Sequence, residues 1–267
     1  MLKDITLGQY YPCKSPVHSM DARIKILLSI VYMAAVFCIG NVYGYATLIL
    51  FTAIIIKISG IPFKFMVKGI RPLMFFILFT AVLNVFLTGG TVIWQLGFLK
   101  VTYEGIVYAA YMIIRIVFLV LGTSLLTYTT SPIQLTDGLE MLLRPFSKIG
   151  LPSHELAMMM SIALRFIPTL LEETDKIMKA QTARGADFES GNIIKRAKAL
   201  IPLLVPLFIS AFRRADELAV AMECRCYHGG NNRTKLHEPK LSMKDLYASV
   251  VFVVFIAVIV LTNIIFG

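Results

Sequence analysis

Long apolar segments separated by short polar ones make up the first half of the chain and its end, a pattern that predicts membrane-spanning helices. An α-helix needs roughly 20 mostly apolar residues to cross the hydrocarbon core of a bilayer. Five segments approach or reach this length: residues 24–40, 45–59, 73–87, 105–128 and 246–265. The two shortest, 45–59 and 73–87, must use flanking residues or lie in a thinner bilayer.

The segment between the fourth and fifth predicted spans, residues 131–245, has a different pattern. Its apolar runs are shorter, its charges more frequent, and over 133–146 the apolar residues recur three and four apart, as on one face of an amphipathic helix. Two stretches resemble spans, but 156–171 contains Arg165 and 199–212 has only 14 residues. We expect both to lie along or just under the membrane, with a true crossing as the alternative.

The composition agrees with a membrane protein. Hydrophobic residues make up 57% of the chain and charged residues 16%, whereas soluble domains average about 45–50% and about 25%. A net charge of +10 would suggest a nucleic-acid partner in a soluble protein, but in a membrane protein Lys and Arg mainly report topology. We therefore expect a lipid bilayer, and no nucleic acid, among the partners.

The distribution of Lys and Arg predicts the orientation. If the N-terminus is cytoplasmic, 24 of the 26 Lys and Arg residues face the cytoplasm, in segments 1–25, 57–71 and 131–247. Lys100 lies outside and Arg115 within a span. We predict a multi-pass protein of the cell membrane with three regions: a four-span membrane part over 1–130, cytoplasmic or juxtamembrane helices over 131–245, and a C-terminal span over 246–267.

A helical ending occurs twice in the cytoplasmic region, 41 residues apart, as Ala183-Arg184-Gly185 and Cys224-Arg225-Cys226. Each Arg has an Asp nine residues before it, an Ala four residues before it, and a small residue on either side. One copy could be a cation that complements a helix dipole, followed by a glycine cap. Capping does not explain the matching Asp and Ala, so the repeat favours two similar docking surfaces. Their partner is expected to be acidic, because Arg presents a planar fork to carboxylates.

Several motifs together resemble those of the transmembrane T component (EcfT/CbiQ-like family) of energy-coupling factor (ECF) ABC-type transporters, over essentially the whole chain. The motifs are the two arginine triplets, residues 15–25 (Ser-Pro-Val-His-Ser-Met-Asp-Ala-Arg-Ile-Lys), residues 164–168 (Leu-Arg-Phe-Ile-Pro) and residues 221–223 (Ala-Met-Glu). The pair of triplets is the specific part of the resemblance.

The resemblance implies an all-α integral membrane protein with about five transmembrane helices plus a cytoplasmic helical coupling domain. Such a subunit joins two ABC-type ATPases to a substrate-binding S component, so that ATP hydrolysis drives uptake of a vitamin or other micronutrient. In this family each triplet's arginine docks into one ATPase, which assigns that role to Ala183, Arg184 and Gly185 and to Cys224, Arg225 and Cys226. The family usually has Ala-Arg-Gly in both places, so the two cysteines leave the closeness of the second contact open.

The residues do not support an enzyme. The chain lacks a Gly-x-x-x-x-Gly-Lys phosphate loop and a Gly-x-Ser-x-Gly nucleophile elbow, so ATP must be bound by partner subunits and no cofactor is expected. Cys224, Cys226 and His228 have no convincing fourth zinc ligand nearby, so no metal is expected.

Two alternatives to a coupling subunit stay open from the residues. A self-contained five-span channel or secondary carrier would need polar groups along the spans or unwound half-helices, which spans 24–40, 45–59 and 246–265 are too apolar to supply. An intramembrane hydrolase is disfavoured because the sequence lacks the metal-ligand residues that such an enzyme would need.

Arg115 needs its own explanation, because it lies about ten residues from the outer end of the fourth span, roughly 15 Å deep at 1.5 Å per residue. An arginine inside a span is a functional hypothesis by default. The alternative is a structural hydrogen bond to Asn84 or to a backbone carbonyl. We favour the structural role, since no acidic residue lies inside any predicted span to complete a relay.

Overall fold

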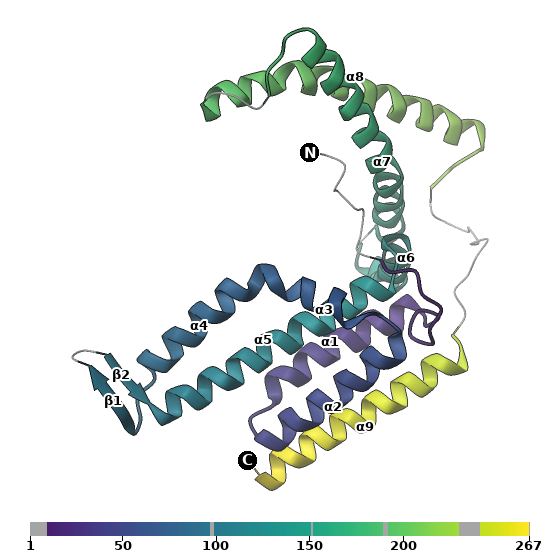
Figure 1. Ribbon diagram of the computed structural model, residues 1–267. Helices are drawn as coiled ribbons and strands as arrows, with labels where there is room; N and C mark the ends of the chain where they lie inside the picture. The colour runs from purple at the N-terminus through teal and green to yellow at the C-terminus, as the bar shows by residue number, and fades with distance from the viewer. Residues whose placement is uncertain (1–9, 97–98, 151, 189–191, 230–240, 267) are drawn as a thin grey trace. The chain divides into compact units, whose positions relative to one another are not determined.

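The computed structural model describes residues 10–96, 99–150, 152–188, 192–229 and 241–266 (Figure 1). The chain divides into two compact units. The first, here called the bundle unit, contains the described residues of 8–138 and 239–267; the second, the α7–α8 unit, contains those of 139–238. The division falls within α6 (Pro132–Leu143).

The bundle unit is helical apart from one hairpin. Its elements are α1 (Ala22–Cys38), α2 (Val42–Ser59), α3 (Phe63–Ile70), η2 (Arg71–Leu73), α4 (Met74–Leu87), β1 (Val92–Leu96), β2 (Leu99–Thr102), α5 (Tyr103–Thr129) and α9 (Met243–Phe266). The α7–α8 unit contains the end of α6, then η3 (Arg144–Ile149), α7 (Ser153–Ala183) and α8 (Ile193–Cys224). The predicted all-α fold class is confirmed.

Within the described residues, five helical segments are long and apolar enough to cross a membrane: α2, the continuous stretch Phe63–Leu87, α5, α7, and Met243–Ile265 of α9. Four of them contain predicted spans. The helix predicted over 24–40 forms as α1, whose 17 residues reach only about 26 Å at 1.5 Å per residue. By length and composition α7, which contains the stretch 156–171, could also cross the membrane. The sequence pattern favours a position along or just under the membrane for that stretch, with a crossing as the alternative.

The predicted third span is longer than its sequence pattern suggested. The sequence pattern placed the start of this span at residue 73, after Gly60, Pro62 and Pro72, whereas the structure has helix from residue 63 onward. Pro62 is the N-cap of α3, and Pro72 lies at the start of η2. Proline is tolerated at such positions because its missing N–H would have no helical partner there. The helical stretch of 25 residues therefore needs no thinned bilayer.

The segment between the predicted spans 73–87 and 105–128 contains a β-hairpin. Strands β1 and β2 pair antiparallel, with Val92 opposite Thr102 and Leu96 opposite Leu99. Thr102 then caps α5, because its side chain accepts a hydrogen bond from the Gly105 N–H at 3.2 Å. The hairpin thus leads directly into the longest helix of the bundle unit.

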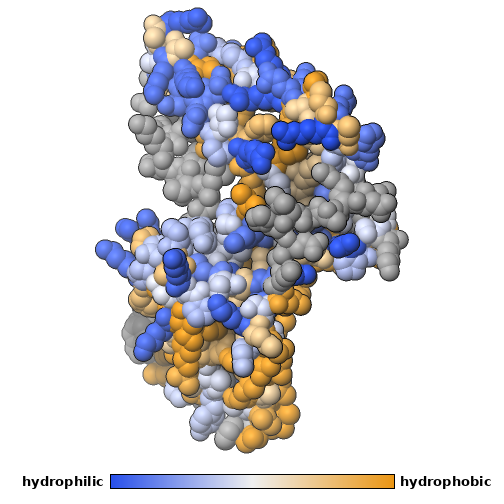
Figure 2. All heavy atoms as spheres, turned by 90° about the vertical axis from the view of Figure 1, so that its right-hand side faces the viewer, coloured by the Kyte–Doolittle hydropathy of each residue, from blue (hydrophilic) through white to orange (hydrophobic). Residues whose placement is uncertain are grey.

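The core of the bundle unit lies where α1, α2, α5 and α9 meet. Its buried residues include Val36, Leu48 and Ile259, which are at most 2% exposed. Phe51 and Phe255 stack with ring centroids 3.9 Å apart. Around this core the outward side chains are also apolar, and orange residues cover much of the lower part of Figure 2. A belt of exposed apolar side chains is what a lipid-facing surface requires.

Charged residues tie the segment before α1 to two other helices. Asp21 caps α1 and forms an ion pair with Arg23 at 2.6 Å. The Asp21 N–H donates to Asp245 Oδ1 at 2.9 Å, and Lys25 Nζ donates to the Thr129 carbonyl at 3.0 Å. Burial by itself would raise the pKa of the Asp21 carboxyl, but hydrogen bonds from Arg23 and the charges of Arg23 and Lys25 hold it below its ordinary value. The start of α1 is thereby fixed to α5 and α9.

Candidate docking site

The end of α7 carries the first arginine triplet. Arg184 is the C-cap residue, and Gly185 follows it with a φ of +89°. The Gly185 N–H donates to the Thr182 carbonyl at 2.9 Å, and the Ala186 N–H donates to the Gln181 carbonyl at 3.0 Å. These two bonds define a Schellman motif, in which the left-handed residue turns the chain sharply away from the helix axis.

The end of α8 has the same hydrogen-bond pattern. The Cys226 N–H donates to the Glu223 carbonyl at 2.8 Å, and the Tyr227 N–H donates to the Met222 carbonyl at 3.0 Å. Arg225 therefore occupies the position in this motif that Arg184 occupies at the end of α7. Cys226, with a φ of +57°, is the one non-glycine residue with positive φ among the described residues. A left-handed residue other than glycine is uncommon and costs energy.

Both arginines are available to a partner. Arg184 and Arg225 are exposed, as are the residues on either side of each. Neither guanidinium forms an ion pair or hydrogen bond within the part of the chain that the structure describes. The small flanking side chains leave the helix ends open to close approach. Each site is thus a free planar donor group at the tip of a helix.

The two helix ends lie far apart along the same unit. Near its end, α7 meets the first half of α8, where the Gln181 side-chain amide lies 3.5 Å from the Pro202 carbonyl. Glu173 of α7 forms an ion pair with Arg214 of α8 at 3.4 Å. From Pro202 to Arg225 is 23 residues, about 35 Å along α8 at 1.5 Å per residue. Figure 1 shows α7 and α8 ending at well-separated points.

Known proteins match the chain over its whole length. The family model described as "CbiQ: Cobalt transport protein" matches residues 13–236. The chain is 56% identical over 269 residues, covering all of both proteins, to the "Energy-coupling factor transporter transmembrane protein EcfT" of Clostridium kluyveri. It is 49% identical over 260 residues to the protein of the same name from Bacillus subtilis, covering 97% of this chain and 98% of that one. The chain belongs to the CbiQ/EcfT family.

Membership of the CbiQ/EcfT family confirms the resemblance drawn from the motifs. The chain is therefore a transmembrane component of an energy-coupling factor transporter, a multi-pass membrane protein that works in a complex with other subunits. The relatives carry the name of a transmembrane component of a transporter.

In this EcfT-family chain, cysteines occupy both sides of the second arginine. All four cysteines are free thiols, and Cys224 and Cys226 are exposed. No group of three or more His, Cys, Asp and Glu side chains suited to a metal ion occurs among the described residues.

Replacing Cys226 by glycine is expected to strengthen the end of α8. Glycine adopts positive φ without the steric cost that a Cβ imposes, so Cys226→Gly should stabilise the helix end by on the order of 0.5–1 kcal/mol. Hydrogen exchange of the Tyr227 amide, which donates to Met222, should slow by roughly two- to fivefold. The matched control is Cys224→Gly, inside the last turn, where glycine weakens a helix and exchange should be faster. Equal effects of the two changes on exchange of the Tyr227 amide would contradict the left-handed conformation of Cys226.

Arg115 lies in the bundle unit and has structural partners. Its Nη2 donates to the Ile39 carbonyl at 3.1 Å and to the Tyr45 hydroxyl at 3.2 Å, at the turn that joins α1 to α2. Of the two partners that the sequence suggested, the structure has a backbone carbonyl; Asn84 donates instead to the Thr80 carbonyl of its own helix. Arg115 is therefore not brought into the α7–α8 unit that carries the arginine triplets.

The sequence did not predict that Lys25 would be buried and donate hydrogen bonds to two backbone carbonyls. The family motif contained it, but its carbonyl partners, His18 and Thr129, are seven and 104 residues away in the chain. A lysine within the first turn of a predicted span was the one available signal, since such a side chain needs partners when it is buried.

Proposed function

We propose that this EcfT-family chain is the coupling and scaffold subunit of an ECF-type importer, linking two cytoplasmic ATPases to a substrate-binding S component. ATP hydrolysis by the ATPases would then drive uptake of a vitamin or other micronutrient. The observation that carries the proposal is the matched pair of Schellman motifs, each presenting an exposed arginine at the same position.

The separation of the two helix ends supports two docking partners instead of one. About 35 Å along α8 lies between its contact with α7 and Arg225. A single small acidic surface cannot bind both arginines at that separation, whereas two copies of a similar groove can. Each groove would hold a carboxylate, because a guanidinium binds carboxylates with two parallel hydrogen bonds.

The apolar face of α8 supports an apolar partner for the same unit. Large hydrophobic side chains along its first two-thirds are exposed, at residues Leu200, Ile201, Leu204, Val205, Phe208 and Phe212. Such a face has to be covered by lipid or by another membrane protein. We assign it to the S component. Movement of either helix end would be transmitted to this face through the contacts of α7 with α8, among them the ion pair of Glu173 with Arg214.

The proposed orientation has the N-terminus and the α7–α8 unit in the cytoplasm, where ATP is available. The distribution of Lys and Arg supports it. ATP would be bound by the partners, so this chain needs no cofactor.

A thiol-protection experiment tests orientation and docking together. In a chain with Cys13→Ser and Cys38→Ser, the exposed Cys224 and Cys226 are the remaining targets for a membrane-impermeant maleimide. We expect labelling in inside-out vesicles and not in right-side-out ones. Adding back the ATPases that copurify with the chain should reduce the labelling rate by about tenfold or more, because the docked helix end excludes the reagent.

The matched control is Glu172→Cys in a chain that lacks all four native cysteines. Residue 172 is exposed on α7 and lies 12 residues before Arg184, about 18 Å along the helix. It should be labelled at the same rate with and without ATPases. Labelling of Cys224 and Cys226 from outside would refute the orientation. Copurification of no ATPase, together with solute movement by the chain alone in liposomes, would favour a channel or secondary carrier instead.

A further inference from the structure

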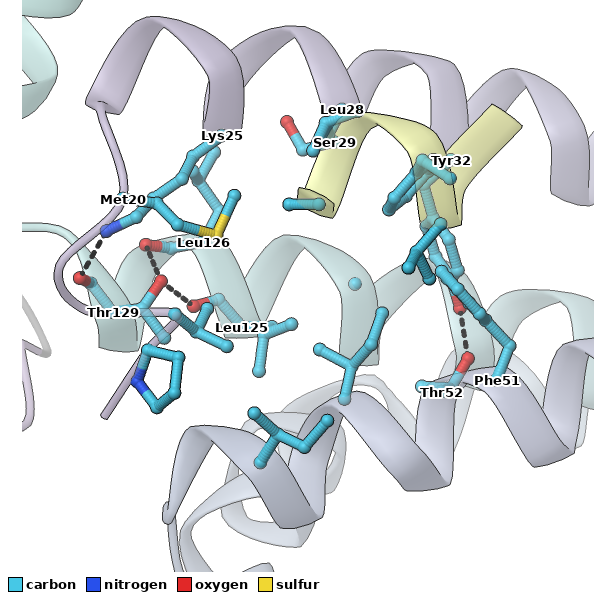
Figure 3. A pocket seen from close by; sticks show the side chains of 18 of the residues that line it. Met20, Lys25, Leu28, Ser29, Tyr32, Phe51, Thr52, Leu125, Leu126 and Thr129 are labelled. Atoms are coloured by element: carbon cyan, nitrogen blue, oxygen red, sulfur yellow. Dashed lines mark hydrogen bonds between the residues drawn. The ribbon is translucent and has the colours of Figure 1, made fainter. Parts of the chain in front are cut away.

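A cavity of about 370 Å³ lies inside the bundle unit, between α1, α2, α5 and α9 (Figure 3). All the residues that line it belong to that unit. Its volume is within the about 300–1,000 Å³ typical of small-molecule sites. Aliphatic and aromatic side chains dominate the wall, among them Leu28, Phe51, Ile55, Leu125, Val251 and Phe252.

The side chain of Tyr32 closes one end of the cavity. Its hydroxyl lies 3.0 Å from Thr52 Oγ1 and donates to the Phe118 carbonyl at 3.2 Å. The ring lies against Gly122, where an added Cβ would come within 2.3 Å of the Tyr32 ring. Tyr32 therefore satisfies its polar atom in the wall and turns an apolar ring toward the cavity. A polar solute would find few partners here, and burying unpaired polar groups is costly.

The opposite end of the cavity, here called the basic end, is lined by two lysines. Lys25 lines it and is only 6% exposed, with Nζ donating to the His18 carbonyl at 3.1 Å and the Thr129 carbonyl at 3.0 Å. An ammonium group has three donors, so one remains beyond these two bonds. Lys244 lines the same end, is exposed, and donates to Ser19 Oγ at 3.2 Å.

The two nearby carboxylates are already engaged. Asp21 pairs with Arg23 at 2.6 Å. Asp245 accepts the Asp21 N–H at 2.9 Å and the Ser242 N–H at 2.7 Å, one on each oxygen. Among the described residues, neither carboxylate forms an ion pair with Lys25 or Lys244, so both ammonium groups can attract an anion.

We propose that this cavity holds one acyl chain of an anionic phospholipid, whose phosphate lies at Lys244 and the free donor of Lys25. The chain would run from the basic end toward Tyr32. From Lys25 to Tyr32 is seven residues, about 10 Å along α1, or roughly two thirds of one leaflet of a ~30 Å hydrocarbon core. An acyl chain in the cavity removes the apolar side chains of its wall from water, which is favourable. The two lysines favour a lipid whose headgroup is negatively charged.

Membrane lipid is the source favoured over other occupants. The cavity belongs to the unit whose surface is a belt of exposed apolar side chains, so acyl chains surround it at all times. Basic pockets between transmembrane helices are known to bind anionic headgroups on the cytoplasmic side, where anionic lipids are enriched. The proposal depends on the bundle unit and not on docking of ATPases to the α7–α8 unit, so either can fail without the other.

Native mass spectrometry of the full-length chain tests the proposal. The protein is exchanged into a non-ionic detergent until its lipid is lost, then incubated with dioleoyl phosphatidylglycerol, dioleoyl phosphatidylcholine or oleate at equal concentrations. We expect one phosphatidylglycerol retained per chain, and about tenfold less retention of phosphatidylcholine and of oleate.

Two pairs of variants locate the retained lipid. Ala248→Phe fills the cavity and should abolish retention of phosphatidylglycerol, whereas Ala257→Phe, on an exposed face of the same helix, should leave it unchanged. Lys244→Gln should lower retention about fivefold, which is the effect of one lysine near an anionic headgroup. Lys57→Gln, exposed and outside the cavity wall, should have no effect.

Three outcomes would overturn the proposal. Equal retention of phosphatidylglycerol and phosphatidylcholine would remove the role of the lysines. Preferential retention of oleate would replace the phospholipid by a free fatty acid. Equal behaviour of Ala248→Phe and Ala257→Phe would place the lipid elsewhere on the protein. Lys244→Gln changes an exposed side chain, so its result holds even if Ala248→Phe does not fold.

Discussion

A chain with Arg184→Glu and Arg225→Glu is expected to lose binding of the proposed ATPase partners and to support no uptake. Both arginines are exposed and unpaired within the described residues, so each is free for a partner carboxylate. Truncating one member of a desolvated, hydrogen-bonded charge pair costs about 2–5 kcal/mol. Reversal adds repulsion at both sites, so we expect affinity to fall by at least about 1,000-fold, since each 1.4 kcal/mol is a factor of ten.

The measurement is copurification of ATPases with the tagged chain, together with solute uptake by whole cells. The matched control is Arg213→Glu, which reverses an exposed arginine in the middle of α8 and should leave both readouts unchanged. Each single reversal should weaken association less than the double one. Survival of association and uptake in the double variant would show that the arginines do not dock the ATPases. Loss of both readouts in the control as well would point to a general effect of charge on the unit.

Gly122→Leu is expected to prevent correct folding of the bundle unit. Even a Cβ at this position would lie 2.3 Å and 2.6 Å from two ring carbons of Tyr32, which is far inside van der Waals contact. The ring cannot move away freely, because the Tyr32 hydroxyl is bonded to Thr52 and to the Phe118 carbonyl. Overpacking costs about 1–3 kcal/mol or more, and each broken hydrogen bond adds about 1 kcal/mol. The sum of about 3–5 kcal/mol reaches the lower end of the stability of a typical domain, about 5–15 kcal/mol.

The variant should give little monodisperse protein on size-exclusion chromatography, and what remains should unfold at a temperature at least about 8 °C lower. Thr123→Leu is the control, since it places the same side chain one residue further along α5 on an exposed position. We expect its yield and Tm to match those of the unchanged chain. If Gly122→Leu were equally well tolerated, the close packing of α1 against α5 at Tyr32 would be wrong.

The sequence predicted those features that depend on local composition. Apolar runs of sufficient length identified the helices α2, α5 and α9, because burying a long run of apolar side chains in lipid requires backbone hydrogen bonds within the segment. The prediction failed between Gly60 and Pro72, where proline and glycine were treated as helix breakers but the chain is helical from residue 63 onward. Pro168, Pro202 and Pro206 lie inside α7 and α8, which continue through them.

The arginine triplets show what a local sequence pattern can predict and what it cannot. Their spacing indicated two equivalent helix ends, and the structure has the same Schellman bonds at both. The sequence could not show that Cys226 adopts the conformation of Gly185, since left-handed φ is rare for any residue with a Cβ. It also could not show how far apart the ends lie, because that separation depends on where α7 and α8 pack against each other.

The sequence by itself determined the class of the protein, the main helices and the two matching arginine-bearing helix ends, because each of these depends on runs or motifs of neighbouring residues. Only the tertiary structure decided the partners of Arg115, the closure of the cavity by Tyr32 and the bonding of Lys25 and Asp245. Asp21 and Asp245 are 224 residues apart, and Lys25 and Thr129 are 104 apart. Such contacts arise from the packing of four helices around one core, and no local pattern records which polar atoms that packing brings together.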